Sequence, residues 1–203
     1  LEPAAAETLR RRIGRLTVVS RSAFPDVECD RFGSDFREVG RLVGRFLLTE
    51  GAASSMYIDL PGEGRAARRS GCEEVLGASG VDPDAVIVSV ESADDLESVV
   101  AARAERVKAI AVSNDCAAVT VMLALSRLGR APGRDVSVLG QGNYPFARRI
   151  RPALSTIDPC GYDVGRRAME ALMQRLSKQR MSAPEETLIA PRVVARDTAR
   201  VGF

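Results

Sequence analysis

The stretch KAIAVSNDCAAVTVMLALSRLGRAPGRDVSVLG, residues 108–140, contains the unit that decides the fold. An apolar run at 108–113 is followed by a helical pattern over 115–128, and a second apolar run occupies 135–140. Two short apolar strands joined through a helix form the repeating unit of a parallel sheet. The stretch therefore predicts a buried parallel sheet with a helix packed on one face.

The same alternation of strand and helix extends in both directions. Strands are expected at 16–20, 27–32, 55–60, 84–90 and 153–158, and 187–196 is either a strand pair or one strand broken at Pro191. Helices are expected around 39–47 and at 65–79, 93–106 and 161–178. This order predicts an α/β fold with a doubly wound parallel sheet. Such sheets bind ligands at the carboxyl ends of their strands.

The composition excludes several classes of catalyst. The chain has 203 residues, of which 45% are apolar and 28% charged, as in ordinary globular domains. It contains no histidine, which excludes Ser-His and Cys-His catalysis and HExxH zinc sites. Its four cysteines form no CxxC pair, so the usual zinc and redox spacings are missing. We therefore expect no enzyme activity, no metal and no other cofactor.

Charge and hydropathy limit the partners. The net charge is only +2, which gives no polyelectrolyte signature for nucleic acid. No apolar run approaches the ~20 residues that a membrane span needs. Scattered thiols are typical of proteins in a reducing cytosol, so we expect a cytoplasmic protein without membrane contact. The opening LEPAAAETLRRRIG, 1–14, has neither an initiator Met nor a signal-peptide profile, and suggests a chain that starts within a longer protein.

Two groups of polar residues lie where the predicted sheet would bind a ligand. Asp115 is expected to cap the helix that follows Asn114, and Asn114 is either a plain turn residue or an amide aimed at a ligand. Arg65, Arg68 and Arg69 open the helix after a Pro-Gly turn, although cations there oppose the helix dipole. They form either a solvated face or an anchor for a ligand hydroxyl or carboxylate.

Four longer stretches together resemble the lactose/galactose repressor family. They are SDFREVGRLVGRFLLTEGAASSMYIDLPGEGRAARRSGCEEVLGASG (34–80), AIAVSNDCAAVTVMLALSRLGRAPGRDVSVLGQGN (109–143), RPALSTIDPCGYDVGRRAMEALMQRL (151–176) and PRVVARDTAR (191–200). They match the family's helix, strand and Pro-Gly turn, its strand ending in Asn-Asp, its "dVSVvG" strand, its "PpLTTI" crossover and its last strand. The resemblance covers nearly the whole chain.

The resemblance implies a two-lobed fold like that of periplasmic binding proteins, with three crossovers between the lobes. Residues 1–50 and 159–184 would form an incomplete N-terminal lobe, which lacks the family's first βαβ stretch. Residues 51–158 and 185–203 would form the C-terminal lobe. The family's helix-turn-helix is absent from this chain.

The resemblance also implies a ligand site made by Asp35, Arg68, Asn114 and Asn143. The family's "G-[FY]-D-D" motif, whose first Asp grips sugar hydroxyls, is Gly140-Gln141-Gly142-Asn143 here, so that carboxylate is missing at Gly142. We therefore expect a neutral or anionic ligand more readily than a simple hexose.

The leading interpretation is the effector-binding core of a transcription regulator. It would bind a small polar effector and form a homodimer, and it would reach DNA only through the absent N-terminal domain. The alternative is the solute-binding protein of a transporter. A small α/β enzyme is disfavoured, because no nucleophile–base pair or metal cluster can be assembled.

Overall fold

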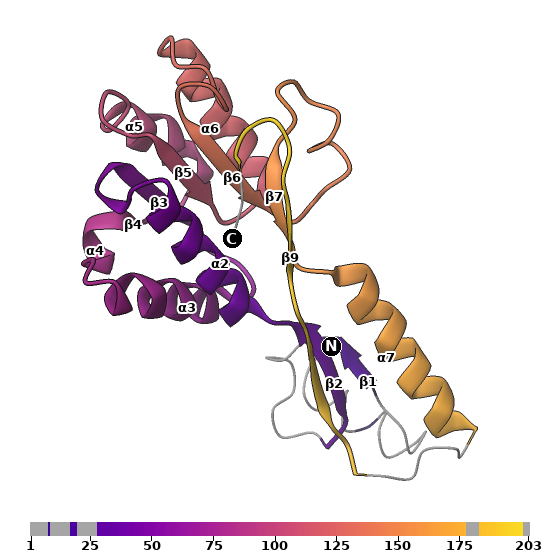
Figure 1. Ribbon diagram of the computed structural model, residues 1–203. Coiled ribbons are helices and arrows are strands. Elements are labelled where there is room, and N and C mark those ends of the chain that lie inside the picture. The colour runs from indigo at the N-terminus through magenta and orange to yellow at the C-terminus, as the bar shows by residue number, and fades with distance from the viewer. Residues whose placement is uncertain (1–7, 9–16, 20–27, 178–182, 201–203) are drawn as a thin grey trace. The chain divides into compact units, whose positions relative to one another are not determined.

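The computed structural model describes residue 8 and residues 17–19, 28–177 and 183–200 (Figure 1). The chain forms two compact units, and it passes between them three times. Unit 1 contains 1–35 and 160–190, and unit 2 contains 36–159 and 191–203. The opening stretch 1–14 lies almost wholly outside the described residues.

Unit 2 is built on a six-stranded sheet with the order β4-β3-β5-β6-β7-β9. All neighbouring strands are parallel except β7 and β9, which are antiparallel. The predicted α/β fold with a mainly parallel sheet is confirmed, and the carboxyl ends of five strands share one edge. The strands are β3 (Ser55–Asp59), β4 (Ile87–Ser89), β5 (Ala109–Val112), β6 (Ser137–Gln141), β7 (Ser155–Asp158) and β9 (Arg192–Val194).

Helices cover both faces of this sheet (Figure 1). Side chains alternate between the two faces along each strand. Met56 and Ile58 therefore join the core cluster of α5 and α6, whereas Tyr57 joins the cluster of α2 and α3. The helices of unit 2 are α2 (Phe36–Thr49), α3 (Arg65–Ala78), α4 (Pro83–Val86), α5 (Leu96–Ala101) and α6 (Asp115–Arg127).

Unit 1 is a three-stranded parallel sheet, in the order β1-β2-β8, with α7 packed on it. Phe32 on β2 packs against the buried residues of α7. Asp30 is fully buried and accepts a hydrogen bond from Arg175 Nη2 at 2.7 Å, which ties the end of α7 to the sheet. The elements are β1 (Thr17–Val19), β2 (Asp30–Ser34), β8 (Glu186–Ile189) and α7 (Gly161–Leu176).

No helix in the described ranges has both the length and the apolar character required to cross a bilayer.

Two elements differ from the sequence prediction, and for a third the structure shows which strands its two halves join. The helix expected at 93–106 ends at Ala101, and turns follow it. The strand expected at 84–90 is reduced to β4, because Asp82 caps the single helical turn of α4 and Pro83 occupies its first position. The stretch 187–196 forms two strands, and they belong to different sheets: β8 pairs with β2, and β9 pairs with β7.

The unit boundary also differs from the predicted lobe boundary at residue 50. Helix α2 belongs to unit 2, because it crosses α3 at very short range. A Cβ atom on Gly40 would lie 1.9 Å from the carbonyl oxygen of Arg68, and one on Gly71 would lie 2.0 Å from that of Arg37. Glycine at both positions lets the two helix backbones touch.

We predict that Gly71→Ala destabilises the protein by about 1–3 kcal/mol, because the added methyl group forces α2 and α3 apart. Gly77→Ala is the matched control in the same helix, since nothing lies within 4 Å of its added Cβ atom. That variant should gain about 0.5–1 kcal/mol from helix propensity. Urea unfolding of the two variants measures both effects, and equal changes would contradict the close helix crossing.

Candidate functional site

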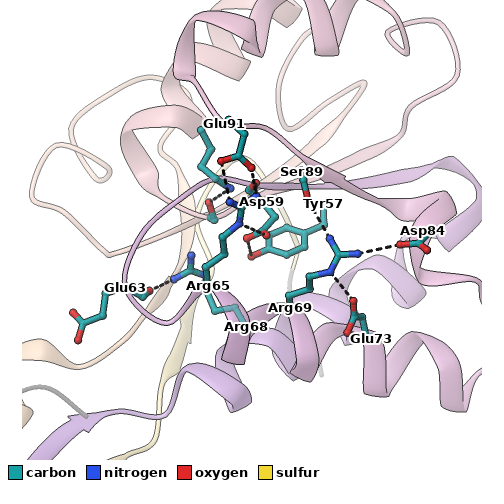
Figure 2. Close-up of polar contacts among 12 residues, drawn as sticks. Tyr57, Asp59, Glu63, Arg65, Arg68, Arg69, Glu73, Asp84, Ser89 and Glu91 are labelled. Atoms are coloured by element: carbon teal, nitrogen blue, oxygen red, sulfur yellow. Dashed lines mark hydrogen bonds and ion pairs between the residues drawn. The ribbon is translucent and has the colours of Figure 1, made fainter. Parts of the chain in front are cut away.

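The carboxyl edge of the six-stranded sheet carries a buried carboxylate that faces the start of α3 (Figure 2). Asp59 ends β3 and is fully buried, and it accepts hydrogen bonds from Arg65 Nε at 2.9 Å and from the Tyr57 hydroxyl at 3.3 Å. Arg65 also pairs with Glu91 at 2.8 Å. Hydrogen bonds with Glu91 and Asp59 raise the pKa of Arg65, and the guanidinium lowers the pKa of Glu91.

Arg68 lies deeper than its neighbours. Its side chain is 3% exposed and stacks over the Phe36 ring at 5.7 Å, and it donates a hydrogen bond to the carbonyl oxygen of Glu63. Its Nε is buried without a hydrogen-bond partner among the described residues. Burial raises the pKa of the adjacent Tyr57 hydroxyl, although the Arg68 charge opposes this shift. Arg68 is thus an embedded cation with an unused donor, rather than part of a solvated face.

Arg69 completes the set at the start of α3 (Figure 2). It pairs with Glu73 at 2.6 Å and with Asp84 at 3.0 Å, and it donates to the Ser89 hydroxyl at 3.1 Å. These contacts offset the unfavourable placement of a cation in a first helical turn. Arg65 and Arg69 therefore hold α3 against the strand ends.

Asn114, rather than Asp115, caps α6. Its Oδ1 accepts a hydrogen bond from the Ala117 N–H at 2.7 Å. Asp115 was expected to be the cap, but it is fully buried and accepts from the Thr156 hydroxyl at 2.6 Å and from the Tyr144 N–H at 2.9 Å. Burial is the main cause that raises its pKa. The amide nitrogen of Asn114 makes no hydrogen bond to the described residues.

Asn143 is held in a network of its own. It adopts a left-handed conformation with φ 53°, and its Nδ2 donates to Asp158 Oδ2 at 2.9 Å. Its Oδ1 accepts from the guanidinium of Arg196. Both ends of the amide are therefore used, so the structure gives Asn143 a role in fixing the loop after β6.

The structure brings three of the four predicted site residues to one edge. Asn114 and Asn143 lie on either side of the Asp115–Tyr144 hydrogen bond, and Arg68 lies beside the end of β3 in the same unit. Asp35 belongs to unit 1, where its backbone N–H donates to the carbonyl of Ile189 at 2.9 Å.

Sequence reasoning missed the buried polar groups that position this edge. Asp59 and Asp115 follow apolar strands, and a carboxylate in that position needs a buried partner, which is a signal that could have identified them. Gln141 ends β6, is 7% exposed, and has an Oε1 without a hydrogen-bond partner in the described part of the chain. No pattern in the sequence indicated that this amide oxygen would be buried and unpaired.

The described residues contain no cluster of acidic, cysteine or histidine side chains that could hold a metal ion. A pocket of about 530 Å³ lies elsewhere in unit 2, lined in part by Ser54, Arg103 and Arg106. It includes none of the predicted site residues.

Comparison with known proteins identifies the family. Residues 35–199 match the periplasmic binding protein-like domain. The chain belongs to this domain family. It is 26% identical over 176 residues to the HTH-type transcriptional repressor PurR of Escherichia fergusonii. The aligned stretch covers 81% of this chain and 50% of that protein. The chain is 32% identical over 96 residues to PurR of Vibrio vulnificus, in an alignment that covers 47% of this chain and 28% of that protein.

The fold comparison agrees. One similar structure is a LacI family transcriptional regulator from Enterococcus faecium with bound ribose. The superposition covers 100% of this chain and 77% of the regulator, with a TM-score of 0.82 and 20% sequence identity. The resemblance to the effector-binding core of the lactose/galactose repressors is therefore confirmed. These relatives are transcriptional regulators rather than enzymes. The chain spans at most about half the length of these curated relatives.

We predict that Asn114→Ala destabilises the protein by about 1 kcal/mol, because α6 loses its capping oxygen. Asn114→Ser should stay within a few tenths of a kcal/mol of the wild type, because a serine hydroxyl can accept the same N–H. Thermal unfolding of the three proteins measures the difference. Two variants of equal stability would show that the cap contributes nothing.

Proposed function

We propose that this chain binds a small polar effector at the carboxyl edge of the six-stranded sheet. One observation carries the proposal: among the described residues, the buried Nε of Arg68 and the amide nitrogen of Asn114 have no hydrogen-bond partner. Both residues stand at the start of a helix, α3 or α6, that follows one of the neighbouring strands β3 and β5. Open parallel sheets bind ligands at this edge. The relative with bound ribose supports a small-molecule ligand for this fold.

The available groups indicate the chemistry of the effector. Arg68 and Asn114 both offer N–H donors, so the ligand presents acceptor oxygens such as hydroxyls or a carboxylate. Gly142 supplies no carboxylate to receive sugar hydroxyls. The missing carboxylate disfavours a simple hexose, so we expect another ligand, either neutral or anionic. Asn143 belongs to the proposed set as the residue that fixes the loop after β6 at this edge.

In the complete regulator, effector binding would change the DNA affinity of an N-terminal helix-turn-helix domain. Linked sites of this kind couple with about 1–3 kcal/mol. The names of the curated relatives, which are HTH-type repressors, support this proposal.

We predict that a panel of sugars, nucleosides and carboxylates contains a ligand whose affinity depends on both donors. Arg68→Ala and Asn114→Ser should each weaken binding roughly 5- to 150-fold, because a ligand oxygen is left unpaired at about 1–3 kcal/mol. Isothermal titration calorimetry measures the affinities. Asn114→Ser keeps the cap acceptor, so it tests the amide donor even if Arg68→Ala disturbs the packing against Phe36.

Arg134→Gln is the matched control, because Arg134 is an exposed arginine that pairs with its neighbour Asp135. It should bind like the wild type. A ligand that both site variants bind unchanged would place the effector elsewhere.

We also predict that this chain is a homodimer with no DNA affinity of its own. Regulators that read two half-sites are two-fold symmetric, and a net charge of +2 leaves little gain from counterion release. Light scattering that gives a monomer at high protein concentration would contradict the dimer. Submicromolar, salt-sensitive binding to duplex DNA would contradict the second part.

A further inference from the structure

An aromatic pair stands in the loop that follows β6. Tyr144 is 49% exposed and stacks on Phe146, with ring centroids 5.7 Å apart and planes 14° apart. Phe146 in turn packs against the core cluster that includes α6. A large, half-exposed ring that is backed by a second ring has the form of a stacking platform.

Gly142 leaves the space in which the Tyr144 ring lies. Its φ of +130° is a backbone angle that residues other than glycine rarely adopt. A Cβ atom there would lie 2.9 Å from Tyr144 Cε2. A carboxylate at 142 and the present position of the ring therefore exclude each other. The Tyr144 ring can lie where it does because position 142 is a glycine and not the acidic residue of the family motif.

The platform is fixed beside the proposed donor. The backbone N–H of Tyr144 donates to Asp115 Oδ2 at 2.9 Å, and Gly142 N–H donates to the Ile157 carbonyl at 2.9 Å. Asp115 directly follows Asn114, whose amide NH2 group makes no hydrogen bond to the described residues. The backbone of Tyr144 and the amide of Asn114 thus belong to one corner, formed by the start of α6 and the loop after β6.

We propose that Tyr144 is a specificity-determining residue that stacks on a planar unsaturated ring of the effector. This inference rests on the proposed function, and it narrows the ligand to aromatic or heteroaromatic molecules that carry acceptor oxygens. A π face attracts a flat ring without requiring particular hydrogen-bonding groups. The acceptor oxygens then occupy the N–H donors of Arg68 and Asn114.

Two pairs of probes isolate the contribution of the ring. Benzoate and cyclohexanecarboxylate carry the same charge and differ in the π system, and uridine and ribose differ by a planar base. Calorimetry should show tighter binding of the planar member in at least one pair. Tyr144→Ala should lose roughly 5- to 150-fold in affinity for that member, whereas Tyr144→Phe should retain it.

The chain offers a second readout and a matched control. It has no tryptophan and only three tyrosines, so its ultraviolet fluorescence comes from tyrosine. A ring stacked on Tyr144 should change this emission, and Tyr144→Phe should abolish the change while binding persists. Tyr162→Ala should bind like the wild type, because Tyr162 is 84% exposed and is not among the residues proposed to bind the effector.

The outcomes separate this inference from the proposed function. Binding that depends on Arg68 and Asn114 but is unchanged in Tyr144→Ala overturns the stacking role alone. Equal affinity within both probe pairs also overturns it. If neither the probes nor the wider panel bind the wild type, both proposals fail.

Discussion

The buried carboxylate of Asp115 is the constraint on which the carboxyl edge depends. It lies at the start of α6 and accepts hydrogen bonds from Thr156 on β7 and from the backbone of Tyr144 after β6. Burial raises its pKa, whereas both hydrogen bonds favour the ionised form. One side chain therefore joins a helix, a strand and a loop that are far apart in sequence.

Other features of the edge follow from this contact. Gly140 lies beneath the carboxylate, where an added Cβ atom would stand 2.3 Å from Asp115 Oδ1. Because Asp115 is turned inward, Asn114 provides the cap through its Oδ1. On the opposite face of the sheet, Asp59 plays a comparable part by holding Arg65. Two buried carboxylates thus fix the starts of α3 and α6 at this edge.

The sequence allowed prediction of the elements whose pattern is strong. The strands near 55–60 and 108–113 and the helices of α3, α6 and α7 were predicted to within a few residues, because apolar runs and glycine stops define them. The helix at 93–106 was predicted too long, since a helical pattern does not reveal where tertiary packing ends. The membership of α2 in unit 2 depends on backbone contact at Gly40 and Gly71, which no periodicity reports.

The candidate site was predictable in type but not in detail. Position after a strand pointed to Asn114, and the family resemblance pointed to Arg68. Neither could show that Arg68 is buried against Phe36, because that contact joins two helices. The choice between Asn114 and Asp115 as cap also lay beyond the sequence, since both residue types cap helices well and the partner of Asp115 is 41 residues away.

Side-chain nitrogen NMR tests the central claim, that the carboxyl edge of this sheet is the ligand site, most directly. The Arg68 Nε–H and Asn114 Nδ2–H2 resonances are recorded while the tightest ligand of the panel is added. We expect both to shift together, with slower solvent exchange, as ligand oxygens occupy these donors. Shifts confined to the pocket of Ser54, Arg103 and Arg106, with both donors unchanged, would contradict the claim.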